Sequence, residues 1–152
     1  MDAYEKLTEK FTHEICGRFL DVNSRVNISY PGNRLNQEAS GHFLHVGLYA
    51  FVLELNGGTG IAYVGKTEGG ERIRAHLTGK TKKGKDLAPS LGTKHKEIKA
   101  ALKKGYKVYL ALEKMDELKK SILSCLEIEC ILEGREQLKK ILRIPSWNKR
   151  AG

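Results

Sequence analysis

The sequence predicts an α/β domain of the α+β kind, with a small, mainly antiparallel sheet of three strands flanked by helices. Two apolar runs, residues 46–55 and 61–64, surround the segment Asn-Gly-Gly-Thr-Gly at 56–60. Because Asn-Gly supplies the positive-φ positions that a tight turn needs, these runs predict a β-hairpin with strands at about 46–55 and 60–65. Residues 106–112 read Tyr-Lys-Val-Tyr-Leu-Ala-Leu, and this alternation predicts a third strand.

Helices are expected both before and after the hairpin along the chain. Residues 3–20 place apolar side chains at helical spacing and predict an amphipathic helix, with Leu7, Phe11, Ile15, Phe19 and Leu20 on its apolar face. Residues 21–41 have no clear period and contain Pro-Gly-Asn at 31–33, so they are expected to form a loop.

The second half of the chain predicts two further helices. Residues 95–104 form the first, which ends at Gly105. A longer helix is expected from Asp116 to about Leu132, with Gly134 as an interruption before a last helical segment at 136–142.

Size and charge narrow the functional classes. At 152 residues the chain is expected to be a single domain, with an N-terminal helix and loop over 1–45 and a core over 46–150. The net charge of +9 favours an anionic partner, nucleic acid before a membrane surface. No apolar run approaches the roughly 20 residues that span a bilayer. The N-terminus lacks a signal-peptide pattern, so we expect an intracellular, cytoplasmic protein.

Cysteine and histidine spacing gives no metal signature. The three cysteines, Cys16, Cys125 and Cys130, form no CxxC pair and are expected to be reduced thiols in helices. His42 and His45 precede the first strand, and no further ligand lies nearby in a recognised spacing. If they continued the strand, an interval of three would place them on opposite faces.

Side chains suited to phosphate chemistry gather around the hairpin. Each strand carries a tyrosine, Tyr49 and Tyr63, and Gly-Lys-Thr follows the second strand at 65–67. A short predicted helix then brings Arg72, Arg74 and His76. Tyrosine hydroxyls, arginines and a histidine together favour binding of a phosphate group over packing alone.

These residues resemble a known family. Gly47-Leu48-Tyr49 and Tyr63-Val64-Gly65 resemble the GIY and YIG halves of the GIY-YIG nucleases, and Arg-Ile-Arg-Ala-His at 72–76 is similar to the arginine-to-histidine helix of that family. Pro-Ser-Trp-Asn at 145–148 resembles the segment that closes many of its domains. The resemblance covers about residues 46–150, with leucine and valine in place of the two isoleucines and a slightly longer spacer between the halves.

The resemblance implies a divalent-metal-dependent DNA endonuclease, restriction-like or phage-encoded, with one Mg²⁺ (or Mn²⁺) per active site. It also implies a metal-binding glutamate on the helix after the third strand, where Leu126-Glu127 fits the pattern. Helical periodicity instead places Glu129 in register with the apolar stripe, where a carboxylate needs a metal or a partner. Glu127 is preferred by motif, and Glu129 remains the alternative.

Roles for the tyrosines and the arginine helix follow from the same resemblance. Tyr49 would act as general base on the attacking water or position it, provided that a nearby cation lowers its pKa. Tyr63 would hold the nucleophile or phosphate, and Arg72 would bind the scissile phosphate. His76, one turn after Arg72, would hydrogen-bond the phosphate or Tyr49.

Outer contacts complete the expected site. Lys66 and Arg74 are expected to contact phosphate, and Asn148 is expected to orient groups near the site as part of the DNA-binding set. The lysine-rich loop over 79–96 follows the arginine helix directly, so Lys82 and Lys83 are expected to contact the DNA backbone. Because one site cuts one strand, double-strand cleavage would need two copies, and we expect a homo-oligomer on DNA.

Two other functions are weighed against the nuclease. Residues 60–67 fit the P-loop pattern G-x-x-x-x-G-K-T, but the four middle residues are apolar and β-prone, so ATP hydrolysis is disfavoured. The stronger rival is a basic nucleic-acid-binding module without cleavage, because the same charge would serve it. Binding alone follows salt, whereas cleavage requires the metal.

Overall fold

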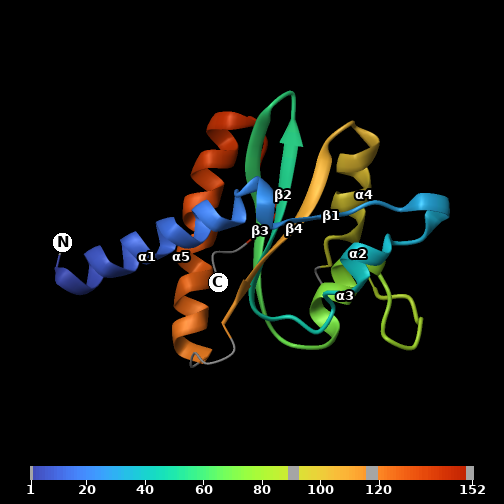
Figure 1. The fold of residues 1–152 in the computed structure, drawn as a ribbon, viewed down its shortest axis with the longest axis horizontal. Coiled ribbons are helices and arrows are strands. Elements are labelled where there is room, and N and C mark those ends of the chain that lie inside the picture. The colour runs from blue at the N-terminus through green and yellow to red at the C-terminus, as the bar shows by residue number, and fades with distance from the viewer. Residues whose placement is uncertain (1, 89–92, 116–119, 150–152) are drawn as a thin grey trace.

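The computed structural model describes residues 2–88, 93–115 and 120–149, with the side chains of Tyr4 and Lys120 left aside. The fold is α+β, and its four-stranded antiparallel sheet has the order β1-β4-β2-β3 (Figure 1). The elements in chain order are α1 (Ala3–Phe19), η1 (Val22–Ser24), β1 (Arg25–Asn27), η2 (Pro31–Asn33), α2 (Gln37–Ser40), β2 (Val46–Leu55), β3 (Gly58–Glu68), α3 (Glu71–Thr78), α4 (His95–Lys103), β4 (Lys107–Lys114) and α5 (Lys120–Ile141).

The three expected strands are present as β2, β3 and β4, but the expected total of three was wrong. Strand β1 lies within the stretch that was expected to be loop, and it pairs with β4 through Arg25↔Ala111 and Asn27↔Tyr109. The side chain of Arg25 is buried and forms an ion pair with Glu54 at 3.1 Å. A three-residue strand is too short for alternation to indicate it, so long-range pairing alone defines β1.

The hairpin turn was predicted correctly and fixes the longest pairing in the sheet. Asn56 and Gly57 have φ values of 51° and 83°, as a two-residue turn of type I′ requires. The register of β2 with β3 shifts between Phe51 and Val52, because Phe51 pairs with Tyr63 while Val52 pairs with Ile61. This bulge brings Tyr63 to the same face of the sheet as Phe51 and Tyr49.

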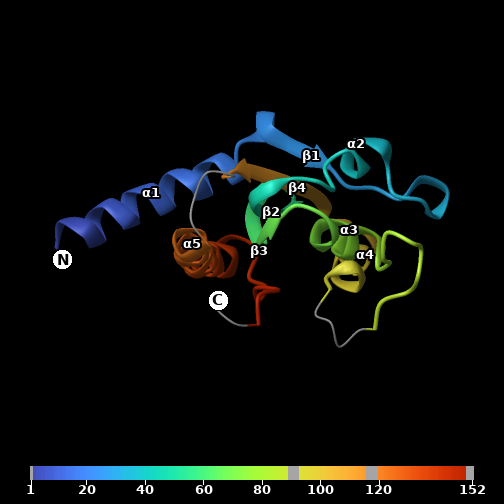
Figure 2. The ribbon, with the colours of Figure 1, turned by 90° about the horizontal axis from the view of Figure 1, so that it is seen from below.

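Helices cover both faces of the sheet (Figure 2). On one face α1 and α5 pack over a core that includes Ile15, Phe19 and Val52. On the other face α3 and α4 pack over Phe51, Ile73 and further buried side chains. The face under α3 therefore also carries the tyrosines that the sequence singled out.

Helix α5 runs without a break through Gly134, so the expected interruption was wrong. A Cβ added at Gly134 would lie 3.2 Å from the side chain of Ile61 on β3. The glycine therefore allows α5 to approach the sheet closely, at the cost of some helix propensity. Residues 116–119 of the expected helix lie outside the described part of the chain.

The histidines and cysteines have ordinary structural surroundings. His42 and His45 lie in the turn before β2 and not on the strand, and Nε2 of His45 is 2.8 Å from the carbonyl oxygen of Leu48. All three cysteines are free thiols; Cys16 and Cys130 are buried and Cys125 is half-buried. Within the described ranges, no helix is both long and apolar enough to cross a membrane.

Candidate functional site

The glycines of the two sequence motifs are required by close packing. Gly47 has φ +132°, and a Cβ there would lie 2.3 Å from the carbonyl oxygen of Glu113 on the neighbouring strand. A Cβ at Gly65 would lie 2.4 Å from Cζ of Tyr49. The ring of Tyr49 therefore lies directly on the β3 backbone, and only glycine leaves room for it.

A hydrogen-bonded chain links Tyr49 to α3 and to the segment before α4. Nε2 of His76 is 3.0 Å from Oη of Tyr49, and the backbone N–H of Lys94 donates to Nδ1 of His76 at 2.9 Å. Since Nδ1 accepts a hydrogen bond, the proton of the neutral imidazole lies on Nε2, which donates to Tyr49. Tyr49 and His76 have no exposed surface. His76 thus takes the tyrosine as its partner, which is one of the two roles expected of it.

Burial keeps both members of this pair uncharged. Desolvation, with the positive charges of Arg72 and Lys94, lowers the pKa of His76 to about 3. Desolvation and then the neighbouring Tyr63 raise the pKa of Tyr49 well above its usual range, although Arg72 acts in the opposite direction. The cation expected to lower the pKa of Tyr49 is therefore present but is outweighed, and the geometry favours a positioning role for Tyr49 over a base.

Arg72 is the charged group that meets both tyrosines. Burial disfavours its charge, but interactions with the hydroxyls of Tyr63 and Tyr49 outweigh this and raise the pKa of Arg72. Arg72 and His76 are one helical turn apart on α3, which places both side chains toward the sheet. The two tyrosines come together as well, because the ring centroids of Tyr49 and Tyr63 are 6.2 Å apart.

Two hollows meet at Arg72. One, of about 410 Å³, is lined by Lys66, Gly69 and Leu123 among others, and runs toward α5. The other, of about 560 Å³, lies between α3 and the lysine-rich loop. A phosphate placed at Arg72 would therefore have open space on both sides along which a chain of nucleotides could continue.

The structure places Glu127, on α5, within reach of the charge and the backbone N–H of Lys66. Burial raises the pKa of its carboxyl group, while the charge and the backbone N–H of Lys66, and then the charge of Arg72, act against this rise. Nζ of Lys66 also donates a hydrogen bond to Ser124 on the same helix. Glu129 is two residues further on and is rotated by about 200° around the helix, away from this group. The local surroundings thus favour Glu127 over Glu129 as the acidic member.

Lys94 is a site residue that the sequence analysis missed. Its side chain is buried, and Nζ lies 5.8 Å from the centroid of the Tyr63 ring. Burial lowers the pKa of Lys94, with Lys149 and Arg72 acting in the same direction and Glu97 against it. Nothing in the sequence distinguishes it from the other 26 lysines and arginines, because only tertiary packing brings it to His76.

Asn148 holds the free edge of β3. Its side-chain oxygen accepts a hydrogen bond from the backbone N–H of Val64 at 2.9 Å, and its amide donates to the carbonyl oxygen of Val64 at 3.0 Å. The backbone N–H of Trp147 donates to Ala62 at 2.8 Å. The segment therefore acts like a short neighbouring strand beside Tyr63, which agrees with an orienting role, and contact of Asn148 with DNA stays a prediction.

The remaining basic residues lie around this centre. Arg74 is turned away from Arg72, with its guanidinium 4.4 Å from the centroid of the Phe43 ring. Lys82 and Lys83 are exposed and line the larger hollow with Arg72. The backbone N–H of Lys82 donates to Glu71 at the start of α3, so the loop is attached to the helix that carries Arg72.

The P-loop interpretation is not compatible with the fold. All of residues 60–67 lie inside β3, and all but Ala62 at the bulge pair with β2, with Lys66 opposite Leu48. A paired strand offers no curled loop of free N–H groups to surround a phosphate chain.

A metal ion at this place would depend on the substrate for ligands. Among the described residues, no group of three or more His, Cys, Asp and Glu side chains could hold a metal ion. Mg²⁺ commonly binds through one or two carboxylates, water and substrate phosphate oxygens, so a single half-buried carboxylate at Glu127 fits that ion.

Comparisons of the chain with protein-family models, with curated proteins and with solved structures found no match. The chemistry of the assembled side chains is therefore the basis for a functional proposal.

Proposed function

We propose that this protein is a divalent-metal-dependent DNA endonuclease of the GIY-YIG type. The observation that carries the proposal is the meeting of Arg72 with Tyr49, Tyr63 and Glu127, which come from four separate elements. Phosphodiester hydrolysis needs a placed water, a cationic clamp on the phosphate and relief of charge on the leaving oxygen. These groups can supply each of the three.

Each side chain has a defined task in this proposal. Arg72 binds two oxygens of the scissile phosphate through its planar fork, and Lys66 adds a second positive charge from β3. Tyr63 hydrogen-bonds the phosphate or the attacking water. Glu127 holds Mg²⁺ or Mn²⁺, which when bound would stabilise charge on the phosphate and on the leaving oxygen.

His76 and Tyr49 act as a fixed pair behind the phosphate. Because Nε2 of His76 donates a hydrogen bond to Oη of Tyr49, the hydroxyl proton of Tyr49 points to another acceptor. We assign an oxygen of the substrate or the attacking water as that acceptor. Tyr49 is fully covered in this structure, so binding of the phosphate by Arg72 would have to open the contact between them. Lys94 sets the imidazole orientation through its backbone N–H.

The proposed DNA path crosses α3. Four lysines of the loop after α3, Lys80, Lys82, Lys83 and Lys85, line the hollow that Arg72 borders. Phosphate contacts from such residues supply sequence-independent affinity that falls with added salt. This arrangement supports DNA as the partner and equally suits the rival function, a binding module without cleavage.

Plasmid cleavage with Mg²⁺ or with EDTA tests the proposal. We expect wild type to nick or linearise DNA only with the metal, and Glu127→Gln to lose at least about a hundredfold in rate, as removal of a catalytic electrostatic group does. Glu129→Gln, the same change two residues away, is the matched control and should retain activity. Binding without cleavage under Mg²⁺ and Mn²⁺ on duplex and single-stranded DNA would establish the binding module instead.

A further inference from the structure

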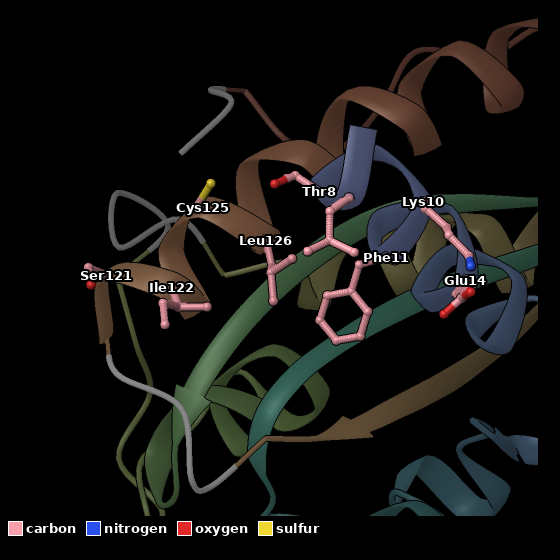
Figure 3. Close-up of a pocket in the computed structure, with 9 residues that line it drawn as sticks. Thr8, Lys10, Phe11, Glu14, Ser121, Ile122, Cys125 and Leu126 are labelled. Atoms are coloured by element: carbon pink, nitrogen blue, oxygen red, sulfur yellow. The ribbon is translucent and has the colours of Figure 1, made fainter. Parts of the chain in front are cut away.

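A second surface lies away from the candidate site. A groove of about 580 Å³ runs between α1 and α5 (Figure 3). Leu7, Phe11 and Ile122 line it with 67%, 40% and 45% of their surfaces exposed. Large apolar side chains that gather from two helices on a surface typically mark an interaction site.

The groove belongs to the layer of helices opposite α3. Helix α1 packs on α5 and β4, and its N-terminal part extends beyond the body of the domain (Figure 2). The buried side of α1 is formed by Thr12, Ile15, Cys16 and Phe19, while Leu7 and Phe11 face outward. Packing within the chain therefore leaves a large part of these apolar side chains uncovered.

The charge of α1 indicates what covers the groove. Whereas the whole chain carries +9, α1 is neutral, with Lys6, Lys10 and Arg18 balanced by Glu5, Glu9 and Glu14. An anionic nucleic acid gains nothing on such a surface. A helix with charges of both signs is instead complementary to an antiparallel copy of itself.

One antiparallel register satisfies two independent features of α1. Leu7, Lys10, Glu14 and Gly17 follow each other at intervals of three and four, so they form one face of the helix. An antiparallel pair with its two-fold axis at the level of Thr12 places Lys10 opposite Glu14 of the second copy. The same register places Leu7 opposite Gly17.

Gly17 has no evident role within the chain. It is exposed in the last part of α1, and a Cβ added there would meet nothing within 4 Å. Glycine costs roughly 0.5–1 kcal/mol relative to alanine inside a helix. A position without a side chain does, however, accommodate the leucine of an adjacent helix.

We propose that two copies of this chain associate about a two-fold axis through antiparallel pairing of α1 with α1, and that this pairing covers the α1/α5 groove. The proposal rests on the exposed apolar groove, the neutral helix and the shared register, and is independent of any nuclease activity. If the chain cuts DNA, the same pairing supplies two active sites.

The molar mass in solution is the first test. Light scattering after gel filtration should give twice the 17.0 kDa of one chain for wild type. Leu7→Glu should weaken the association at least about tenfold, as loss of an apolar anchor at an interface does. Leu44→Glu is the matched control, because Leu44 is 77% exposed and lies outside the groove. A monomeric wild type up to its solubility limit, or a dimer unaffected by Leu7→Glu, would overturn the proposal.

Charge exchange tests the register itself. In a dimer of Lys10→Glu, the new glutamate of each copy faces Glu14 of the other copy. In a dimer of Glu14→Lys, the new lysine of each copy faces Lys10 of the other. Each variant alone should therefore be mainly monomeric. An equimolar mixture of the two should form a heterodimer, since every facing pair is again of opposite sign. Repulsion within one helix persists in the mixture, so recovery can come only from contacts between chains. Glu9→Lys, on another face of α1, should dimerise like wild type; absence of a heterodimer would refute this register.

Cys125 gives a readout that does not depend on mass. It is the half-buried cysteine of the three and lines the groove (Figure 3). Maleimide labelling of Cys125 should be slower in concentrated wild type than in Leu7→Glu at the same concentration. Equal labelling rates would mean that the groove stays open, and that outcome counts against its coverage by a second copy.

Discussion

His76 should make this protein sensitive to mild acid. The imidazole has no exposed surface and is surrounded by Tyr49, Tyr63, Arg72 and the backbone of Lys94. Burial is the main cause that lowers its pKa from 6.5 to about 3, and the neighbouring positive charges add to it. The folded state therefore keeps His76 neutral at a pH at which the unfolded chain is already protonated.

The size of the effect follows from these two pKa values. Between about pH 6.5 and pH 3 the unfolded state binds one more proton than the folded state, so the free energy of unfolding falls as the pH falls. The free energy of unfolding is therefore about 2 kcal/mol lower at pH 5 than at pH 7.5, since each pH unit below the pKa of the unfolded state costs 1.36 kcal/mol. This is a large fraction of the 5–15 kcal/mol that typically stabilises a domain.

Urea unfolding at pH 7.5 and at pH 5 measures this loss of unfolding free energy. Wild type should lose about 2 kcal/mol more than His76→Gln over this interval, because the glutamine does not titrate. His45 and His95, whose pKa values are also lowered by burial, are present in both proteins and cancel in the comparison. Tyr49→Phe should retain the acid loss, since burial and not the tyrosine is its main cause. An equal loss in wild type and His76→Gln would refute the reasoning.

Three further predictions test the support of the site and its partner. Gly65→Ala should destabilise the fold by about 3 kcal/mol or more, since its Cβ would meet the ring of Tyr49 at 2.4 Å; thermal unfolding measures this, and a change below about 1 kcal/mol would contradict it. Asn148→Ala should cost roughly 1–3 kcal/mol in denaturant unfolding through its lost hydrogen bonds to β3, and unchanged stability would argue against its bracing role. Replacing Lys82 and Lys83 with glutamine should reduce the dependence of log K for DNA on log salt by about one for each lost phosphate contact, as fluorescence anisotropy at several salt concentrations would show. An unchanged salt dependence would exclude both lysines from the DNA path.

Local sequence signals were sufficient for the regular elements around the site. Asn56-Gly57 identified the hairpin because few residue pairs adopt its two positive φ angles. The apolar period of residues 3–20 identified α1 within one residue of its end. The long C-terminal helix was recognised, but Gly134 was misinterpreted as a break, since its close contact with Ile61 involves a residue more than seventy positions away.

The assembly of the candidate site was decided by tertiary structure. Whether Tyr49 and Tyr63 share a face depends on the bulge between Phe51 and Val52, and a shift of one residue would separate them. Lys94 carried no sequence signal, yet its backbone completes the hydrogen-bonded chain through His76.

The sequence by itself determined that this protein has a hairpin and amphipathic helices, because each of these depends on residues close together in the chain. It also determined the excess of positive charge, which depends on composition alone. Only the tertiary structure decided that Glu127 lies within reach of the charges of Lys66 and Arg72, because the rotation of α5 against the sheet sets that position. The pairing of β1 with β4 and the groove between α1 and α5 have the same origin. They depend on contacts between segments that are far apart in sequence, which no local pattern specifies.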